Sequence, residues 1–293
     1  MKKRPLKWRL IVALGVAINT LLWLLSRVLG KRRQAIVLST ILEQLQFVYE
    51  QPIQGNGTLR FYASAYKPAW RGFTLYAKQP EVPRWIDTFE DHSVFWDVGA
   101  NVGVYSLYAA KCKAAQVVAF EPESANYFIL TRNIALNCLG KAITPYSIAL
   151  AERMQFDRLN LFHMAIGGSR HAFGDLTKSW SSGSDPIFSQ GMVAFAIDDL
   201  VFTYGFPFPH HIKIDVDGIE SEIISGAPRV LADMRLRSVL IEGQEHRPNE
   251  TRRMQGMLES FGLHMIEDAG ANQIYRRTGS VAPIARPTKL ASN

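Results

Sequence analysis

Short apolar runs that alternate with helical stretches constrain the fold of this chain more than any other feature. Five such runs follow one another after His92, and two more come near the end of the sequence. They are Val94–Val98, Gln116–Phe120, Ile143–Ile148, Ile212–Val216 and Ser238–Ile241, followed by Leu263–Ile266 and Gln273–Tyr275. The alternation is typical of a doubly wound α/β fold, in which helices cover both faces of a parallel sheet. The last two runs predict a closing hairpin.

Acidic residues stand at the ends of four of the first five runs. They are Asp97, Glu121, Asp215 with Asp217, and Glu242, whereas the third run leads into Ala149. A single acid in such a place is readily explained as a helix cap. In an open parallel sheet, however, ligands bind beyond the carboxyl ends of the strands. Several acids at one edge therefore predict a binding site there.

The segment Asp97-Val-Gly-Ala-Asn-Val-Gly joins the first run to a helical stretch. Its glycines, Gly99 and Gly103, permit a tight turn and a close approach of the backbone to a ligand. The spacing is not the G-x-G-x-x-G of a dinucleotide site, and the preceding acid would repel a phosphate and attract a cation. Glu121 is placed to accept both hydroxyls of a ribose. The pattern favours a positively charged nucleoside without phosphate, of which S-adenosylmethionine (SAM) is the common example.

Four segments together resemble the FkbM-type branch of class I SAM-dependent methyltransferases. They read FWDVGANVGVYSLYAA, VVAFEPESANYFILTRNIALN, IDDL and IKIDVDGIESEIISGA, within a resemblance that runs from about Leu59 to Arg276. It implies a Rossmann-like sheet of seven mostly parallel strands with an antiparallel last strand. It also implies O-methylation of a hydroxyl, usually on a sugar or a natural product.

The same resemblance assigns cofactor contacts along the chain. Asp97, Gly99, Asn101 and Gly103 would surround the methionine part of SAM. Glu121 would hold the ribose, and residues around Ala149 would border the adenine.

Methyl transfer to a hydroxyl requires alignment of the acceptor oxygen and removal of its proton. Asp215 is the first candidate for the base or for the group that orients the acceptor, and Glu242 and His246 follow it. His246 is equally well explained as an exposed loop residue. The acids Asp215, Asp217 and Glu242 would also suit a divalent cation, and this alternative stays open. The cysteines and histidines show no metal-ligand spacing, so we expect no metal.

The interval from Ala151 to Ala194 is the longest without a clear alternation of strand and helix. Its GGSRHAFGD and SWSSGSD segments are typical of loops. Because the interval follows the third run, we expect it to fold over the acceptor site as a lid, although a surface excursion without a role is an alternative.

The beginning of the chain is basic and apolar. Nine of the 33 Lys and Arg residues lie in residues 1–33, which leaves 24 against 26 acids in the rest. This balance favours a membrane surface over nucleic acid as partner. The 17 uncharged residues of Leu10–Ser26 would form a helix of roughly 25 Å, slightly short of a ~30 Å hydrocarbon core. A secretory signal, or a helix that packs on the body or on a second subunit, is the alternative.

These patterns predict four regions and a location. Residues 1–33 form a membrane-associating helix, 34–58 an amphipathic helix and linker, 59–278 the methyltransferase domain and 279–293 a flexible tail. Because SAM is made in the cytosol, we expect the domain at the cytoplasmic face of a membrane, with a lipid-linked or membrane-assembled glycan as acceptor. A nicotinamide-dependent oxidoreductase and a non-catalytic membrane-tethered scaffold are the alternative functions.

Overall fold

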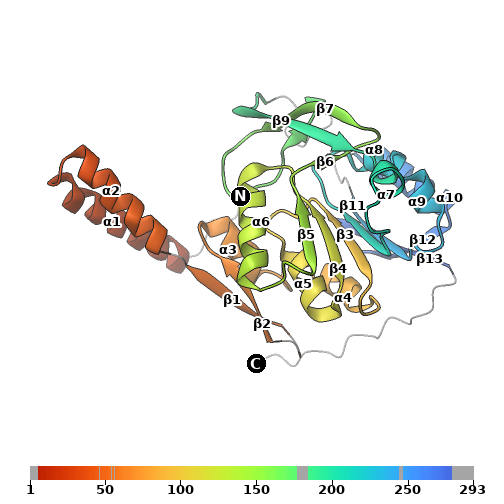
Figure 1. Ribbon diagram of the computed structural model, residues 1–293, viewed down its shortest axis with the longest axis horizontal. Helices are drawn as coiled ribbons and strands as arrows, with labels where there is room; N and C mark the ends of the chain where they lie inside the picture. The colour runs from red at the N-terminus through yellow and green to blue at the C-terminus, as the bar shows by residue number, and fades with distance from the viewer. Residues whose placement is uncertain are drawn as a thin grey trace. The chain divides into compact units, whose positions relative to one another are not determined.

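The computed structural model of the protein describes residues 6–45, 47–53, 55, 57–176, 184–243 and 247–278. Between Phe47 and Val48 the chain divides into two compact units (Figure 1). Two of the predictions, the catalytic role of His246 and the flexible tail 279–293, fall outside the described residues.

The first unit contains two helices, α1 (Leu6–Arg27) and α2 (Lys31–Gln44). Within α1, the 18 residues of Leu10–Arg27 have a mean hydropathy of 1.8, and 6% of this window is buried. The 22 residues of α1 correspond to about 33 Å of helix, which slightly exceeds a ~30 Å hydrocarbon core. By length and composition, α1 is therefore able to cross a membrane.

The amphipathic helix expected within residues 34–58 corresponds to α2, which ends at Gln44. Where a linker was expected, Val48 begins a strand, β1 (Val48–Ile53), which pairs antiparallel with β2 (Gly57–Tyr62). The hairpin belongs to the second unit. There the backbone N–H of Tyr62 donates to Oδ1 of Asn133 (2.7 Å), so a side chain of the body holds the hairpin. The compact body thus begins before residue 59.

The body is built on a seven-stranded sheet with the order β12-β13-β11-β10-β3-β4-β5. Its strands are β3 (Val94–Val98), β4 (Gln116–Phe120), β5 (Ile143–Tyr146), β10 (His211–Ile214), β11 (Ser238–Glu242), β12 (Leu263–Asp268) and β13 (Asn272–Arg277). The five strands from β5 to β11 are parallel, and β13 runs antiparallel between β11 and β12. This topology confirms the predicted fold class, including the closing hairpin.

Helices cover both faces of this sheet (Figure 1). Phe95 belongs to a core cluster with residues of α4 (Glu81–Asp87), α5 (Val104–Lys113) and α6 (Ser124–Leu136). Its neighbour Trp96 points to the opposite face and joins a second cluster. That face is covered by α7 (Ile197–Phe202), α8 (Glu220–Ser225), α9 (Pro228–Ala232) and α10 (Pro248–Ser260). Burial on both faces explains why the strands are continuous apolar runs.

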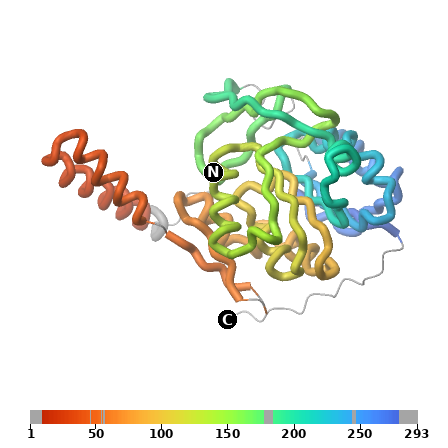
Figure 2. The backbone as a smooth tube through the Cα atoms, in the orientation of Figure 1, coloured from red at the N-terminus to blue at the C-terminus, as the bar shows by residue number. Residues whose placement is uncertain are grey.

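The interval from Ala151 to Ala194, in which no clear alternation of strand and helix was found, contains most of a second sheet. Its four strands have the order β6-β9-β7-β8 and are β6 (Ala149–Leu150), β7 (Gln155–Leu161), β8 (Ala172–Phe173) and β9 (Phe188–Phe195). It forms the green layer at the top of the view in Figures 1 and 2. Leu161 and Ala194 are buried in the same core cluster as Trp96, so contacts with the main sheet stabilise these strands. Two loops, GGSRHAFGD and the described part of SWSSGSD, remain largely irregular.

Candidate active site

The loop after β3 is held by its neighbours in the body. Gly99 has φ +79°, and a Cβ at this position would lie 2.0 Å from the carbonyl oxygen of Asp215. Gly103 has φ +85°, and a Cβ there would lie 2.5 Å from Cδ1 of Leu130 on α6. Gly99 is therefore required by packing against backbone as well as by its positive φ, whereas Gly103 is required mainly by its positive φ, because the end of the Leu130 side chain is able to shift. The close approach of this loop to a ligand stays a separate prediction.

Glu121 follows β4 and fastens two loops at the edge of the sheet. It is 5% exposed, and its Oε2 accepts the N–H of Asn101 (2.7 Å) while Oε1 accepts that of Glu123 (2.9 Å). Burial raises the pKa of this carboxyl to about 7, although both backbone donors lower it. The side chain of Asn126 is a further hydrogen-bond donor to this carboxyl, and the contact of Glu121 with the hydroxyls of a ribose stays a prediction.

Asp97 is fully buried in β3 and forms an ion pair with a lysine of the neighbouring strand β10. Its Oδ2 accepts the hydroxyl hydrogen of Ser106 (2.6 Å), and its Oδ1 lies 3.5 Å from Nζ of Lys213. Lys213 stands directly opposite Asp97 in the register of β10 and β3. Asp97 is thus held by Ser106 and Lys213, and its contact with the methionine part of SAM stays a prediction.

Lys213 also binds Asp215, the first candidate for the base. Its Nζ lies 2.8 Å from Oδ2 of Asp215. Burial would raise the pKa of Asp215, but the charge and the hydrogen bond of Lys213 lower it to about 2. Burial would likewise lower the pKa of Lys213, but Asp215 and Asp97 raise it. Lys213 and Asp215 are therefore both charged near neutral pH.

Glu242 ends β11 and shares a hydrogen bond with Asp215. Burial and the negative charge of Asp215 raise the pKa of Glu242 to about 10. Two adjacent carboxyls in a poorly solvated site hold one proton and one negative charge. Here Asp215 carries the charge and Glu242 carries the proton, so two of the three predicted catalytic residues form one unit.

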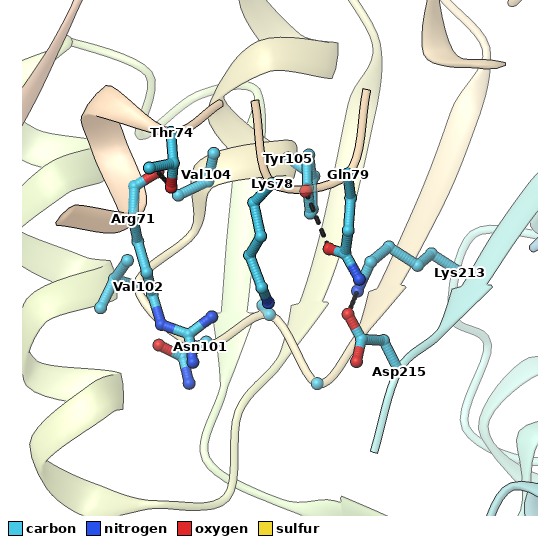
Figure 3. Close-up of a pocket in the computed structure, with 12 residues that line it drawn as sticks. Arg71, Thr74, Lys78, Gln79, Asn101, Val102, Val104, Tyr105, Lys213 and Asp215 are labelled. Carbon is cyan, nitrogen blue, oxygen red and sulfur yellow. Dashed lines mark hydrogen bonds and ion pairs between the residues drawn. The ribbon is translucent and has the colours of Figure 1, made fainter. Parts of the chain in front are cut away.

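A cavity opens beside this unit (Figure 3). It encloses roughly 390 Å³ of space, part of which is open solvent. Of the predicted residues, Gly99, Asn101 and Asp215 line it. The remaining lining residues are Arg71, Thr74, Lys78, Gln79, Ala100, Val102, Val104, Tyr105 and Lys213.

The loop between β7 and β8 is fastened to the same edge of the sheet. Nδ2 of Asn101 donates to the carbonyl of Gly168 (2.6 Å), and Nε of Arg71 donates to the carbonyl of Gly167 (2.8 Å). Oδ2 of Asp217 accepts the N–H of His171 (3.1 Å), and burial raises the pKa of Asp217 to about 6. The interval predicted as a lid thus contacts the glycine loop, and its action on an acceptor stays a prediction.

Ala149 does not line the cavity. It begins β6 and pairs with Ala194 in the second sheet, so its contact with adenine stays a prediction. Among the described residues, no group of three or more His, Cys, Asp or Glu side chains is arranged to hold a metal ion.

Sequence reasoning missed three cations of the site. Lys213 lies two positions before Asp215, and alternation along a strand places both on one face. This spacing could therefore have predicted that Lys213 lies beside Asp215. Arg71 in α3 (Tyr66–Phe73) and Lys78 in the following turn lie before the motifs in the sequence. No pattern in the sequence connects these two residues to the glycine loop.

The residues present fit SAM. Asp215 supplies an anion for the sulfonium, and Glu121 supplies hydroxyl acceptors. Oδ1 of Asn101, whose residue lines the cavity, is buried without a hydrogen-bond partner among the described residues. A buried acceptor of this kind calls for a donor from a ligand. These features suit a ligand that carries positive charge and hydroxyls.

The chain was compared with known proteins. The FkbM methyltransferase domain family matches residues 97–269. A hexuronic acid methyltransferase, AglP, of Haloferax volcanii is 25% identical over 185 residues, which cover 62% of this chain and 69% of that protein. The methyltransferase sdnD of Sordaria araneosa is 26% identical over 195 residues, which cover 59% of this chain and 74% of that protein.

A solved structure of a SAM-dependent methyltransferase from Agrobacterium tumefaciens aligns with a TM-score of 0.44 and 9% identity. The alignment covers 79% of this chain and 71% of that one. The family match spans more than half of the chain and includes the glycine loop, Glu121, Asp215 and Glu242. The chain therefore belongs to the FkbM methyltransferase family, and it is a methyltransferase with S-adenosyl-L-methionine as its cofactor.

Proposed function

We propose that the protein methylates a hydroxyl oxygen of a sugar or glycan, with a natural product as the alternative acceptor. The observation that carries this proposal is the ionised Asp215 in the cavity wall, hydrogen-bonded to a protonated Glu242. A carboxylate in this position is able to accept a hydrogen bond from a hydroxyl. The hexuronic acid named for the AglP protein supports a sugar as acceptor.

Asp215 orients the acceptor more than it activates it. Its pKa of about 2 makes it too weak a base to ionise a free alcohol before the reaction. An oxygen that is gaining a methyl group becomes far more acidic, however, so even a weak carboxylate base accepts its proton late in the transfer. When bound, SAM would supply a methyl group whose bond to sulfur is exchanged for a bond to the acceptor oxygen, with the electron pair left on the sulfur. Asp215 would accept the hydroxyl proton.

Positioning supplies the rest of the catalysis. Well-held reactants gain about 7 to 11 kcal/mol in favourable cases, and a general base contributes roughly 10² to 10⁴-fold. The loop that contains Gly167 and Gly168 is fastened to Arg71 and Asn101, which line the cavity. We propose that this loop excludes water from the side of the cavity where the acceptor binds.

We place the enzyme at the cytoplasmic face of a membrane. The support is the exposed apolar helix α1, together with a supply of SAM in the cytosol. A lipid-linked or membrane-assembled glycan would meet the enzyme there. Whether α1 spans the membrane or lies on it does not alter this proposal.

The experiment that tests the acceptor compares glycans and lipids from cells with and without the gene by mass spectrometry. We expect one sugar-containing species to lose 14 Da in the deletion strain and to regain it with the wild-type gene. Cells that carry Asp215→Asn should not regain it. Restoration by Asp215→Asn, or a mass difference confined to molecules without a hydroxyl acceptor, would contradict the proposal. Full complementation by Glu121→Ala would instead favour a non-catalytic scaffold.

A further inference from the structure

Two cationic side chains project into the cavity from the chain segment before the sheet. They are Arg71 of α3 and Lys78, shown together with Lys213 and Asp215 in Figure 3. Nε of Arg71 donates to the carbonyl of Gly167 (2.8 Å), whereas its terminal amino groups make no hydrogen bond within the described ranges. The ammonium of Lys78 has neither a hydrogen bond nor an ion pair with any residue that the structure describes. Both side chains therefore keep donors for a ligand.

Lys78 is an exposed residue whose side chain lines the cavity, so its ammonium is open to a ligand. Desolvation is the largest influence on its pKa and lowers it, the charge of Asp215 raises it, and the charge of Arg71 lowers it. A bound carboxylate would accept charge-assisted hydrogen bonds from this ammonium.

Three N–H groups of the glycine loop are already used within the body. Those of Gly99 and Ala100 both donate to the carbonyl of Phe120 (3.0 Å each). The N–H of Asn101 donates to Glu121. Anion binding by the backbone at a helix N-terminus needs free N–H groups. These three are therefore not available to an anion, whereas the donors of Arg71 and Lys78 are.

The two signs of charge are separated along the cavity. Figure 3 shows Arg71 toward one side, Asp215 paired with Lys213 toward the other, and Lys78 between them. An ionised Asp215 repels an anion, so a carboxylate is directed to the side of the two unpaired cations. A sulfonium has the opposite preference. The cavity is thus polarised to match a ligand that carries both groups.

We propose that Arg71 and Lys78 bind the carboxylate of the methionine part of SAM and thereby direct the sulfonium toward Asp215. This inference rests on the methyltransferase reaction at the same site and adds cofactor-binding residues to it. The carboxylate bound by Arg71 and Lys78 would belong to the acceptor and not to SAM if the acceptor were acidic, such as a sugar with a carboxylate. The test therefore separates the cofactor from the acceptor.

The test measures binding to the full-length protein by isothermal titration calorimetry, with no acceptor present. The two ligands are SAM and decarboxylated SAM, which keeps the sulfonium but lacks the carboxylate. For Lys78→Met we expect a loss of SAM affinity of roughly 10- to 100-fold, as for one charge-assisted hydrogen bond. The affinity for decarboxylated SAM should stay that of the wild type. Arg71→Met should give the same selective loss, and Lys78→Arg should restore most of the SAM affinity.

Lys67→Met is the matched control, because Lys67 lies on the same helix as Arg71 but does not line the cavity. It should leave both affinities unchanged, and thermal unfolding of each variant verifies that the body is folded. Equal losses for both ligands in Lys78→Met would overturn the inference, since the cation would then act on something other than the carboxylate.

An unchanged SAM affinity in Lys78→Met would also overturn it. Weaker acceptor binding in that variant would then assign the cations to an anion of the acceptor. Because no acceptor enters the calorimetric test, an error in the proposed acceptor leaves its outcome unaffected.

Discussion

Lys213 and Asp215 lie two positions apart on one edge of the sheet, with Nζ of the lysine 2.8 Å from Oδ2 of the aspartate. The same ammonium lies 3.5 Å from Oδ1 of Asp97 on the neighbouring strand. One buried cation therefore compensates two carboxylates, and the ionised state of Asp215 depends on it.

Replacement of Lys213 by Met should destabilise the body by about 3–5 kcal/mol, because it leaves buried carboxylates without a counter-charge. The pKa of Asp215 should rise at the same time, since Lys213 is what lowers it. Urea unfolding measures the first effect and the pH profile of methyl transfer the second. Lys111→Met, at an exposed position of α5, is the control. Adding Asp97→Asn to Lys213→Met should recover part of the loss, and a further loss would contradict the charge-compensation argument.

Glu242→Gln should stabilise the protein at alkaline pH. The pKa of Glu242 is raised to about 10 from 4.5, so the folded state binds its proton more tightly than the unfolded state does. The stability from this group is full below pH 4.5 and is lost as the pH rises toward 10, by up to about 1.4 kcal/mol per pH unit. Gln cannot ionise, so the variant escapes this loss.

The measurement for Glu242→Gln is the free energy of unfolding between pH 5 and pH 9, in parallel with the wild type. The difference should grow with pH in favour of the variant. Glu259→Gln, on the exposed side of α10, should show no such trend. A constant or reversed difference would show that Glu242 is ionised in the folded protein.

Gly99→Ala should be among the most damaging single substitutions in the loop. Its Cβ would overlap the carbonyl oxygen of Asp215 at 2.0 Å, and its φ of +79° is strained for any other residue. Strain of this kind alone costs of order 1–3 kcal/mol, and the overlap adds to it. The expected result is a lower midpoint of thermal unfolding together with weaker SAM binding. Gly140→Ala, where an added Cβ meets nothing within 4 Å, is the matched control and should leave both unchanged.

Deletion of residues 1–33 should move the protein from the membrane fraction to the soluble fraction. The physical reason is the loss of the exposed apolar side chains of α1 and of nine basic residues. Fractionation of cells followed by immunoblotting measures the distribution. Substitution of the four basic residues Arg27, Lys31, Arg32 and Arg33 by Gln tests the electrostatic contribution of these residues to membrane binding. An unchanged distribution of the deletion variant would refute the membrane proposal.

The sequence alone determined the architecture of the body and the edge where chemistry takes place. Val94–Val98 and Gln116–Phe120 were predicted with their observed bounds, because strands buried on both faces are continuous apolar runs between turn residues. The acids that end these runs had to meet at one edge, since parallel strands all end on the same side. The family resemblance rested on the same segments and was confirmed.

Tertiary structure decided what those acids do. Strand register placed Lys213 opposite Asp97 and next to Asp215, where it lowers the pKa of Asp215. Burial and the charge of Asp215 in turn raise the pKa of Glu242. Arg71 and Lys78 reach the cavity from a segment far from the motifs in sequence. The second sheet formed because its short strands bury side chains against the main sheet. Charge compensation and burial depend on distances between remote segments, which local sequence patterns do not specify.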